Sequence, residues 1–425
     1  MSGRAGRGGR GAAEERAGRA RRGVARERAA VVIVGGGPAG AVLAAGLAGR
    51  GQSVVVLERS PVWHWRASGV FASPAAVRAL RRVGLDELTL ATVARPIPAM
   101  RVETRSGAAF RLTYGADAGG ESAVGFDRSR LDPALLDLAT AAGADVRRGW
   151  GVTAVDLEAG TLQVRNPEGG TSAMAASVIV GADGLHSIVA RTAGVARPAR
   201  LDQRVGLSYH LADTDPAACR DARMRILGDG YVGIAPVAGG RVNVGIVLGR
   251  SWRPALIRDG ARAVAASIVA GIPPIDGDPA VWRHGRPTDD VAGAWPLGHR
   301  VTRRAGRGWL LVGDAAGFLD PFSGEGLHRA IVSAELASAA IAGNDRGRTD
   351  AFAGYDRAMQ RRFLAKDALS WLVQVFLGRP AMFDYAARRL ASRPAVRATM
   401  GLVMGDLVPA GRALDPRYLA ALLAP

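Results

Sequence analysis

Two short apolar runs near the N-terminus enclose a glycine-rich stretch. Ala30–Val34 and Ser53–Leu57 are rich in valine and isoleucine, which is typical of strands that are buried on both faces. Between them, Gly35–Gly40 supplies turn residues, and Ala41–Arg50 has the composition of a helix that ends at Gly51. This order predicts a βαβ unit with two neighbouring parallel strands and a helix packed on the sheet.

The same region has a second interpretation as a membrane segment. Ala29–Gly49 carries no charged residue and follows an arginine-rich stretch, as a signal peptide or membrane anchor would. Gly35–Gly40 lies at its centre, however, and a cluster of glycine and proline would break a spanning helix. We therefore favour the buried strand, turn and helix.

Apolar and polar positions alternate in several later segments, as expected for strands with one face in a core. These segments are Met100–Thr113, Val205–Leu211, Ala222–Leu227, Tyr231–Pro236 and Arg241–Leu248. We expect an antiparallel sheet in which Tyr231, Ile234 and Val244 belong either to the core or to a ligand site.

Helices are expected from Ala351 to the C-terminus. An apolar stripe runs along this region at Phe363, Leu364, Leu369, Trp371, Leu372, Val375 and Phe376. The stripe indicates packing against the rest of the protein. The alternative is a lid or apolar entrance for a lipid-like substrate at a membrane surface.

Charge and cysteine content indicate which partners and which cellular compartment to expect. The 425 residues carry a net charge of +18, and Lys366 is the only lysine among the 56 Lys and Arg residues. Residues 1–29 are rich in Arg, Gly and Ala without apolar periodicity, so we expect a disordered tail and no specific nucleic-acid partner. Cys219 is the only cysteine, which excludes an intrachain disulfide and favours a reducing compartment.

The glycines of the first turn have the spacing of a dinucleotide-binding motif. Gly35 permits the tight turn, Gly37 lets the backbone approach a diphosphate, and Gly40 allows close contact between helix and strand. The helix N-terminus offers free N–H groups and a positive dipole end to that diphosphate. Glu58, at the end of the second strand, can accept hydrogen bonds from ribose hydroxyls. FAD, NAD and NADP all stay open at this point, although the acid disfavours a 2′-phosphate.

Two further strand ends carry a carboxylate in a glycine turn. Val178–Ser187 contains Asp183, and Gly308–Gly317 contains Asp314. Gly324–Gly326 then opens a helix of about 17 residues. Asp314 can hydrogen-bond a polyol chain such as the ribityl chain of a flavin, and the helix N-terminus can meet the negative charge of a reduced flavin ring. A dehydrogenase that uses nicotinamide alone has no need for this second corner, so the pair favours FAD.

These three motifs, in this order, resemble the flavoprotein superfamily that contains aromatic hydroxylases such as p-hydroxybenzoate hydroxylase, geranylgeranyl reductases and flavin halogenases. The resemblance implies that Asp314 binds the ribityl chain, that Gly324–Leu327 lies beside the isoalloxazine, and that Asp183 helps to hold the flavin domain. It also implies that Arg128 lies along the cofactor, with Asp132 as N-cap and Pro133 as first residue of the following helix. A plain surface ion pair is the alternative for Arg128.

The motifs and the resemblance together give one set of expected cofactor-binding residues. They are Gly35, Gly37, Pro38, Ala39, Gly40, Glu58, Arg59, Arg128, Asp183, Gly313, Asp314, Gly324, Gly326 and Leu327. No metal site is expected.

Details of the motifs separate the branches of this superfamily. Aromatic hydroxylases typically have His where Gly317 stands, and Asp320-Pro321 follows here, which resembles the reductase branch. Arg66–Pro74 is similar to a reductase loop, but Ser68 stands where that loop usually has Cys, which puts cysteine-dependent chemistry in doubt. Halogenases use an active-site lysine, and Lys366 lies past the flavin motifs, which argues against halogenation.

We therefore expect an FAD-dependent oxidoreductase whose reduced flavin acts on a hydrophobic small molecule, with NAD(P)H as a transient reductant. Reduction of a C=C bond of the geranylgeranyl reductase type is favoured, and an oxygen-dependent monooxygenase is the alternative. No side chain is an obvious acid or base; Ser68 and Glu325 are the candidates. The Trp63-His64-Trp65 cluster is interpreted as packing near the flavin loop.

The expected fold is α/β. A Rossmann-like FAD-binding domain with a parallel sheet comprises residues 30–95, 125–200 and 291–345. An antiparallel substrate domain comprises 96–124 and 201–290, and a helical region comprises 346–425. A cytoplasmic location follows from the reducing compartment, with peripheral contact at the inner membrane face as the alternative.

Overall fold

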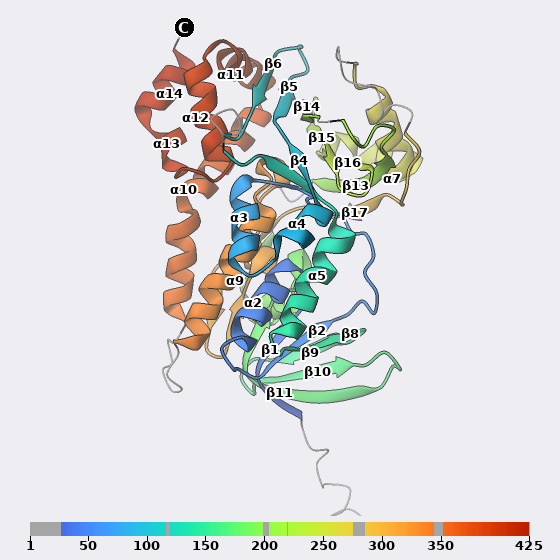
Figure 1. Cartoon of the computed structure of the whole chain (residues 1–425), viewed down its shortest axis with the longest axis vertical. Coiled ribbons are helices and arrows are strands. Elements are labelled where there is room, and N and C mark those ends of the chain that lie inside the picture. Colours follow the sequence, from blue (N-terminus) through green and yellow to red (C-terminus); the bar gives the residue numbers. More distant parts are fainter. Residues whose placement is uncertain are drawn as a thin grey trace, which may run out of the picture.

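The computed structural model describes residues 27–115, 120–198, 204–218, 220–274, 285–343 and 352–424. A mixed sheet with helices packed on it forms one part, and a second, mostly antiparallel sheet lies at its far end beside a cluster of C-terminal helices (Figure 1). The arginine-rich residues 1–26 and Cys219 lie outside the described residues, and β1 begins at Glu27, three residues inside the expected tail.

The predicted βαβ unit is confirmed. Strand β1 (Glu27–Val34), helix α2 (Pro38–Ala48) and strand β2 (Val54–Glu58) follow one another, and the two strands pair in parallel, with Val31 opposite Val54. The central strand positions are almost fully buried, which explains the uninterrupted apolar runs.

The first sheet extends β1 and β2 on both sides in the order β19-β20-β11-β1-β2-β8. The added strands are β8 (Asp145–Arg148), β11 (Thr171–Gly181), β19 (Ala305–Gly306) and β20 (Trp309–Leu311). Strands β9 (Gly151–Asp156) and β10 (Thr161–Arg165) pair antiparallel with one another, and β10 also pairs with β11. Helix α2 packs between α5 (Arg128–Ala141) and α9 (Gly326–Ala342) (Figure 1).

The start of α5 differs from the prediction. Asp127, not Asp132, is the N-cap, because its Oδ1 accepts a hydrogen bond from the Ser129 N–H at 3.0 Å. Pro133 therefore lies inside the helix, and the Asp132 carboxylate is free to pair with Arg128 one turn earlier. The sequence holds two candidate caps five residues apart, and the earlier one satisfies the helix's first N–H groups.

The second sheet has the order β17-β13-β16-β15-β14-β5-β6 and is antiparallel except between β14 and β5. Its strands are β5 (Met100–Glu103), β6 (Ala109–Leu112), β13 (Val205–Ala212), β14 (Ala222–Ile226), β15 (Gly230–Val237), β16 (Arg241–Leu248) and β17 (Ala292–Ala294). The predicted segments are thus strands, except that Met100–Thr113 is two strands joined by a turn. Helix α7 (Arg253–Ala270) was not foreseen; together with Ile234 and Val244 it forms the core behind this sheet.

Shorter elements connect the two sheets. They are β3 (Phe71–Ala72), α3 (Pro74–Arg82), α4 (Glu87–Val93), β4 (Ala94–Ile97), β7 (Ala123–Phe126), α6 (Ile188–Thr192), β12 (Ala196–Pro198) and β18 (His299–Val301). Ser73 and Pro74 begin α3, and Gly84 follows its end at a φ of +100°.

The C-terminal region is helical, as predicted. It comprises α10 (Ala353–Leu377), α11 (Pro380–Ser392), α12 (Pro394–Met404), α13 (Gly411–Leu414) and α14 (Pro416–Leu423). Phe363 and Leu369 of the predicted stripe are buried, whereas Leu364 and Val375 are exposed. The stripe is therefore narrower than the sequence indicated. None of the described helices is both long enough and apolar enough to span a bilayer.

Candidate functional site

The first corner lies where β1 ends and α2 begins. Gly35 has a φ of +106°, and a Cβ on it would lie 2.5 Å from the Ala182 carbonyl oxygen. A Cβ on Gly40 would lie 2.0 Å from the Gly35 carbonyl oxygen, whereas one on Gly37 would meet nothing within 4 Å. Gly35 and Gly40 are therefore required by packing, and Gly37 leaves backbone exposed to an open space.

Glu58 ends β2 beside this corner. Its Oε2 accepts a hydrogen bond from the Gly36 N–H at 2.9 Å, and its Oε1 accepts from the Ser60 N–H at 2.9 Å and from Arg66 Nη2 at 3.1 Å. Burial opposes the charge of the carboxylate, but the two backbone N–H groups and the Arg66 guanidinium outweigh it and lower the pKa of Glu58. Glu58 is therefore an ionised acceptor at the edge of the corner.

The second corner follows β20 and touches the first. Gly313 has a φ of +58°, and a Cβ on it would lie 2.8 Å from the Ala39 Cβ on α2. The Gly313 N–H donates to Ser333 Oγ at 2.9 Å, which ties the corner to α9. Two glycine turns that are more than 270 residues apart in the sequence, at Gly37 and Gly313, thus lie side by side.

Asp314 follows Gly313 in this corner. Burial raises the pKa of its carboxyl to about 6, although the charges of Arg128 and Arg329 oppose the rise. Within the part of the chain that the structure describes, no side chain or N–H donates a hydrogen bond to its carboxylate oxygens. Asp314 is therefore a partly exposed acceptor that lacks the partners a carboxylate normally has.

A pocket lies against the first corner. It is lined by Gly36, Gly37, Pro38, Glu58, Ser60, Val62, Trp63, His64, Arg66, Ser68, Arg128, Asp132, Pro133, Leu136 and Arg148. Arg128 donates from Nε to Asp132 Oδ1 at 2.6 Å and from Nη1 to the Gly69 carbonyl at 2.9 Å. Arg128 is thus both an ion-pair partner and a pocket residue, and its side chain is mostly buried. Ser68 lines the same pocket, whereas Arg59 is exposed and does not.

A third turn leads into α9. Asp320 is buried; its Oδ1 accepts from Tyr231 Oη at 2.5 Å, and its Oδ2 accepts from Arg204 Nη1 at 2.7 Å. Gly324 has a φ of +65° with the Phe71 ring 2.6 Å from its missing Cβ, and a Cβ on Gly326 would meet nothing within 4 Å. The α9 N-terminus is thus fixed by packing on one side and open on the other.

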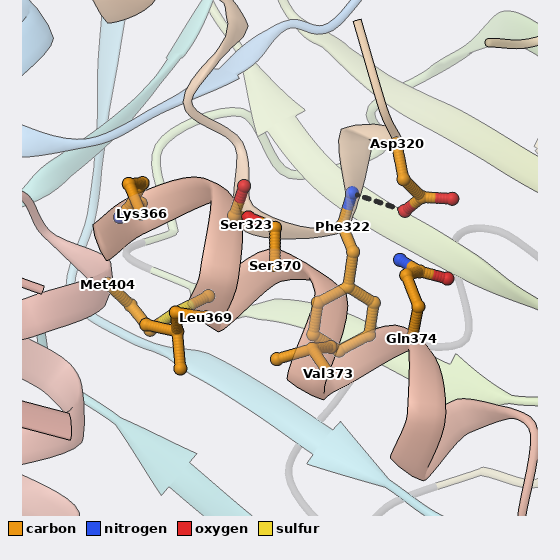
Figure 2. Close-up of a pocket in the computed structure, with 9 residues that line it drawn as sticks. All are labelled: Asp320, Phe322, Ser323, Lys366, Leu369, Ser370, Val373, Gln374 and Met404. Carbon is orange, nitrogen blue, oxygen red and sulfur yellow. Dashed lines mark hydrogen bonds between the residues drawn. The ribbon is translucent and has the colours of Figure 1, made fainter. Parts of the chain in front are cut away.

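Lys366 is buried behind this turn, where it lines a second pocket together with Asp320, Ser323 and Met404 (Figure 2). Lys366 Nζ lies 2.7 Å from Asp406 Oδ1 and 3.7 Å from Glu325 Oε2, and His328 Nδ1 lies 3.2 Å from Asp406 Oδ2. Burial raises the pKa of Glu325, opposed by Lys366 and Arg329. These contacts link the Glu325 turn to α10.

Asp183 lies in the turn that follows β11, and one of its carboxylate oxygens is hydrogen-bonded within the protein. Its Oδ2 accepts from the Ile188 N–H at 2.7 Å at the start of α6, and its Oδ1 is buried without a hydrogen bond from the described residues. Burial raises the pKa of this carboxyl. Asp183 therefore holds the turn that packs against Gly35, and one oxygen is left for a further donor.

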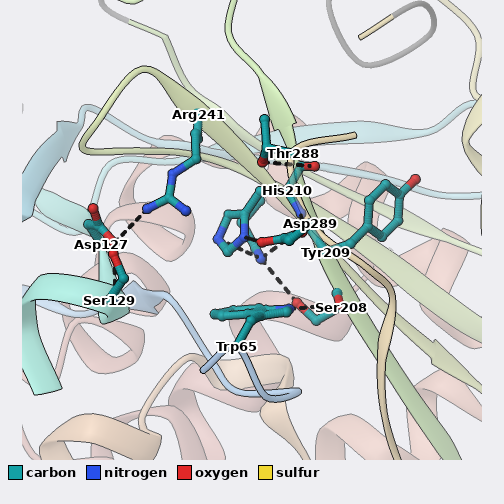
Figure 3. A network of polar contacts seen from close by, with 10 residues as sticks. Trp65, Asp127, Ser129, Ser208, Tyr209, His210, Arg241, Thr288 and Asp289 are labelled. Atoms are coloured by element: carbon teal, nitrogen blue, oxygen red, sulfur yellow. Dashed lines mark hydrogen bonds and ion pairs between the residues drawn. The ribbon is translucent and has the colours of Figure 1, made fainter. Parts of the chain in front are cut away.

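One group of contacts was not foreseen from the sequence. Trp65 Nε1 donates to the Ser208 carbonyl at 2.9 Å, and its ring lies 4.3 Å from that of His210, whose Nδ1 is 2.6 Å from Asp289 Oδ2 (Figure 3). Burial lowers the pKa of His210, partly offset by Asp289. These contacts join the loop after β2 to the second sheet. The tryptophan cluster was visible in the sequence, but its partner strand was not.

Comparison with known proteins identifies the family and the relatives of the chain. The family of FAD-binding domains matches residues 28–362. The chain is 29% identical over 331 residues to digeranylgeranylglycerophospholipid reductase 1 of Methanococcoides burtonii, covering 74% of this chain and 76% of that protein. It is 26% identical over 390 residues to menaquinone reductase of Mycolicibacterium smegmatis, covering 89% and 91%.

The fold is also found among solved structures. A geranylgeranyl bacteriochlorophyll reductase-like protein from Thermoplasma acidophilum superposes with a TM-score of 0.74 at 22% identity, over 93% of this chain and 98% of that one. The three motifs, their convergence and the family match agree: this chain belongs to the FAD-binding domain family and is an FAD-dependent oxidoreductase.

Proposed function

We propose that the protein reduces a C=C bond in a neutral hydrophobic small molecule, with FAD as the resident cofactor and NAD(P)H as a transient electron donor. When bound, FAD supplies the hydride. The observation that carries the proposal is the contact between the Gly37 and Asp314 corners, together with a buried apolar cluster in which Tyr231 and Val247 of the second sheet pack with Phe71 and Phe322. The named reductases among the relatives support the direction of the reaction.

The residues of the site fit FAD. The open space at Gly37 leaves room for a diphosphate against the N–H groups of α2, and ionised Glu58 can accept hydrogen bonds from the adenosine ribose. Asp314, which lacks hydrogen-bond donors among the described residues, can accept hydrogen bonds from the ribityl hydroxyls. Arg128 lines the pocket at the first corner and acts electrostatically on Asp314, and its charge would balance that of the diphosphate.

The α9 N-terminus would face the flavin ring. Its first N–H groups and the positive dipole end favour negative charge, and a reduced flavin carries that charge at its pyrimidine edge. Gly326 leaves the approach open, while Gly324 fixes the turn against Phe71. We propose that this arrangement favours the reduced cofactor.

Anaerobic turnover tests the proposal. The yellow holoprotein is incubated with NADPH and a prenylated quinone or polyprenyl lipid, and the product is analysed by mass spectrometry. We expect a gain of two hydrogen atoms that is independent of oxygen and that fragmentation places in the prenyl chain, because reduction of a quinone ring to a quinol gives the same change in mass. A product that gains an oxygen atom, formed only in air, would establish the monooxygenase alternative instead.

A further inference from the structure

One row of the second sheet carries very little side-chain volume. Gly233 on β15 is paired with Gly245 on β16, and Gly245 is paired with Ser208 on β13. These three residues, here called the glycine row, lie side by side across the middle strands of the sheet. Glycine weakens the interior of a strand, and it often marks a place where a ligand approaches the backbone.

The glycine row faces the cofactor side of the sheet. Side chains two residues apart on a strand share a face, so Gly233 shares its face with Tyr231, and Ser208 with His210. Tyr231 contacts Asp320 beside α9, and His210 contacts Trp65 from the loop after β2. Asp320 and Trp65 both belong to the FAD-binding part of the chain. The glycine row therefore lies between them and opposite the flavin corners.

The space above the glycine row is open. A Cβ on Gly233 would meet only the Gly245 carbonyl oxygen, at 3.9 Å. A Cβ on Gly245 would meet only Asn243 Oδ1 at 3.7 Å and the Gly233 carbonyl oxygen at 3.9 Å. Both glycines are partly exposed although Tyr231, Asn243 and Ser208 around them are buried. Because neighbouring rows are about 6.8 Å away on each side, this space can take the thickness and width of a flat ring.

The polar groups at this space are neutral. Asn243 Nδ2 donates to Ser208 Oγ at 3.0 Å, which leaves the Ser208 hydroxyl proton and Asn243 Oδ1 for a ligand. The nearby guanidinium groups are already paired, Arg241 with Asp127 and Arg204 with Asp320. A hydroxyl donor beside a carbonyl acceptor suits a ring that carries a carbonyl in one redox state and a hydroxyl in the other.

We propose that the glycine row seats a planar, uncharged, carbonyl-bearing ring of the quinone type, whose oxygen meets Ser208 Oγ or Asn243 Oδ1. This rests on the proposed function and names the substrate class of that site. The apolar remainder of the substrate would lie over Tyr231 and Val247.

Binding to the oxidised holoenzyme tests the inference without turnover. Menadione is the probe, and its dissociation constant is measured from the change in flavin absorbance. Gly233→Val and Gly245→Val should each weaken binding about tenfold or more, because the added methyl groups occupy the ring's space. FAD content should stay unchanged and the melting temperature should stay equal or rise, since valine suits a strand better than glycine.

The controls separate this idea from the proposed function. Gly354→Val, on the exposed side of α10 where a Cβ meets nothing within 4 Å, should leave menadione binding unchanged. Gly233→Ala should have a smaller effect and covers the case of a valine variant that does not fold. The sulfonated analogue 1,4-naphthoquinone-2-sulfonate should bind more weakly than menadione. Wild-type protein that does not bind menadione, valine variants that bind it normally, or equal binding of the sulfonate would overturn the inference, whatever the turnover experiment shows.

Discussion

Asp314→Asn should move the stability of the apoprotein and its affinity for FAD in opposite directions. Burial raises the pKa of this carboxyl from 3.8 to about 6 in the absence of the cofactor, so the folded apoprotein disfavours its charged form. A difference of about two pKa units corresponds to about 3 kcal/mol. This is an upper bound, because the carboxylate is partly exposed and keeps some hydration. Asparagine keeps the shape and removes the charge.

The sign of the pH dependence follows from the raised pKa. Well below pH 3.8 the carboxyl is protonated in both the folded and the unfolded chain, and it costs no stability. Between about pH 3.8 and 6 the unfolded chain ionises first, so the folded state loses stability as the pH rises. At pH 7.5 apo Asp314→Asn should therefore be more stable than wild type, and this difference should shrink towards zero as the pH falls to about 3.

The affinity for FAD should fall in the same variant. A hydrogen bond to a charged acceptor contributes about 1.5–3 kcal/mol, so loss of the charge at the ribityl chain should raise the FAD dissociation constant roughly 10- to 150-fold. Denaturant unfolding of the apoprotein and fluorescence titration with FAD measure the two effects. Glu335→Gln, which removes an exposed ion pair with Arg82, is the matched control and should change neither by much. An apo variant no more stable than wild type at pH 7.5, with unchanged FAD affinity, would refute this account of Asp314.

Three further outcomes follow from the packing. Gly40→Ala should prevent folding of the first corner, because its Cβ would lie 2.0 Å from the Gly35 carbonyl oxygen. Gly37→Ala should fold normally and bind FAD more weakly, because its Cβ would meet no protein atom within 4 Å. Circular dichroism and FAD content distinguish the two variants. Lys366→Met should lower the free energy of unfolding by about 3–5 kcal/mol in a denaturant titration, because it leaves the Asp406 carboxylate buried without its cation. Burial opposes the charge of Asp406, but His328 and Lys366 outweigh it and lower the pKa of Asp406 to about 2. Wild type should therefore lose stability as the pH falls from about 4 towards 2. Lys366→Met should show a smaller loss over that range.

Local glycine geometry made much of the cofactor corner predictable. Gly35, Gly40 and Gly324 are each needed for a positive φ or a close approach within a few residues, so their spacing is written into a short stretch of sequence. The helix that begins at Gly326 has the expected 17 residues. The start of α5 was less predictable: Asp132 was the predicted N-cap, and the structure has Asp127 instead.

Contacts between distant segments could not be predicted. Trp65 hydrogen-bonds to Ser208, which lies 143 positions later on a strand. Lys366 of α10 forms its ion pair with Asp406, which follows α12 in the sequence. Lys366 shows the limit clearly. Its position late in the chain argued against a place near the flavin turn, yet the fold puts it 3.7 Å from Glu325.

The cofactor corner and the glycine row are encoded differently in the sequence. This explains why the cofactor could be inferred from the sequence and the glycine row could not. A diphosphate is held by consecutive backbone N–H groups, so one turn and one helix start suffice and their glycines form a recognisable motif. The glycine row is assembled from three strands, and it exists only because register places Gly233 opposite Gly245 and Gly245 opposite Ser208. In the sequence each of these glycines is merely a weak position in a strand. A shift of one strand by one residue would turn its member of the row to the opposite face and fill the space with the side chain of a neighbouring residue. Under our proposal for the glycine row, the register of the second sheet therefore determines, as much as any single residue does, which substrates this flavoprotein can accept.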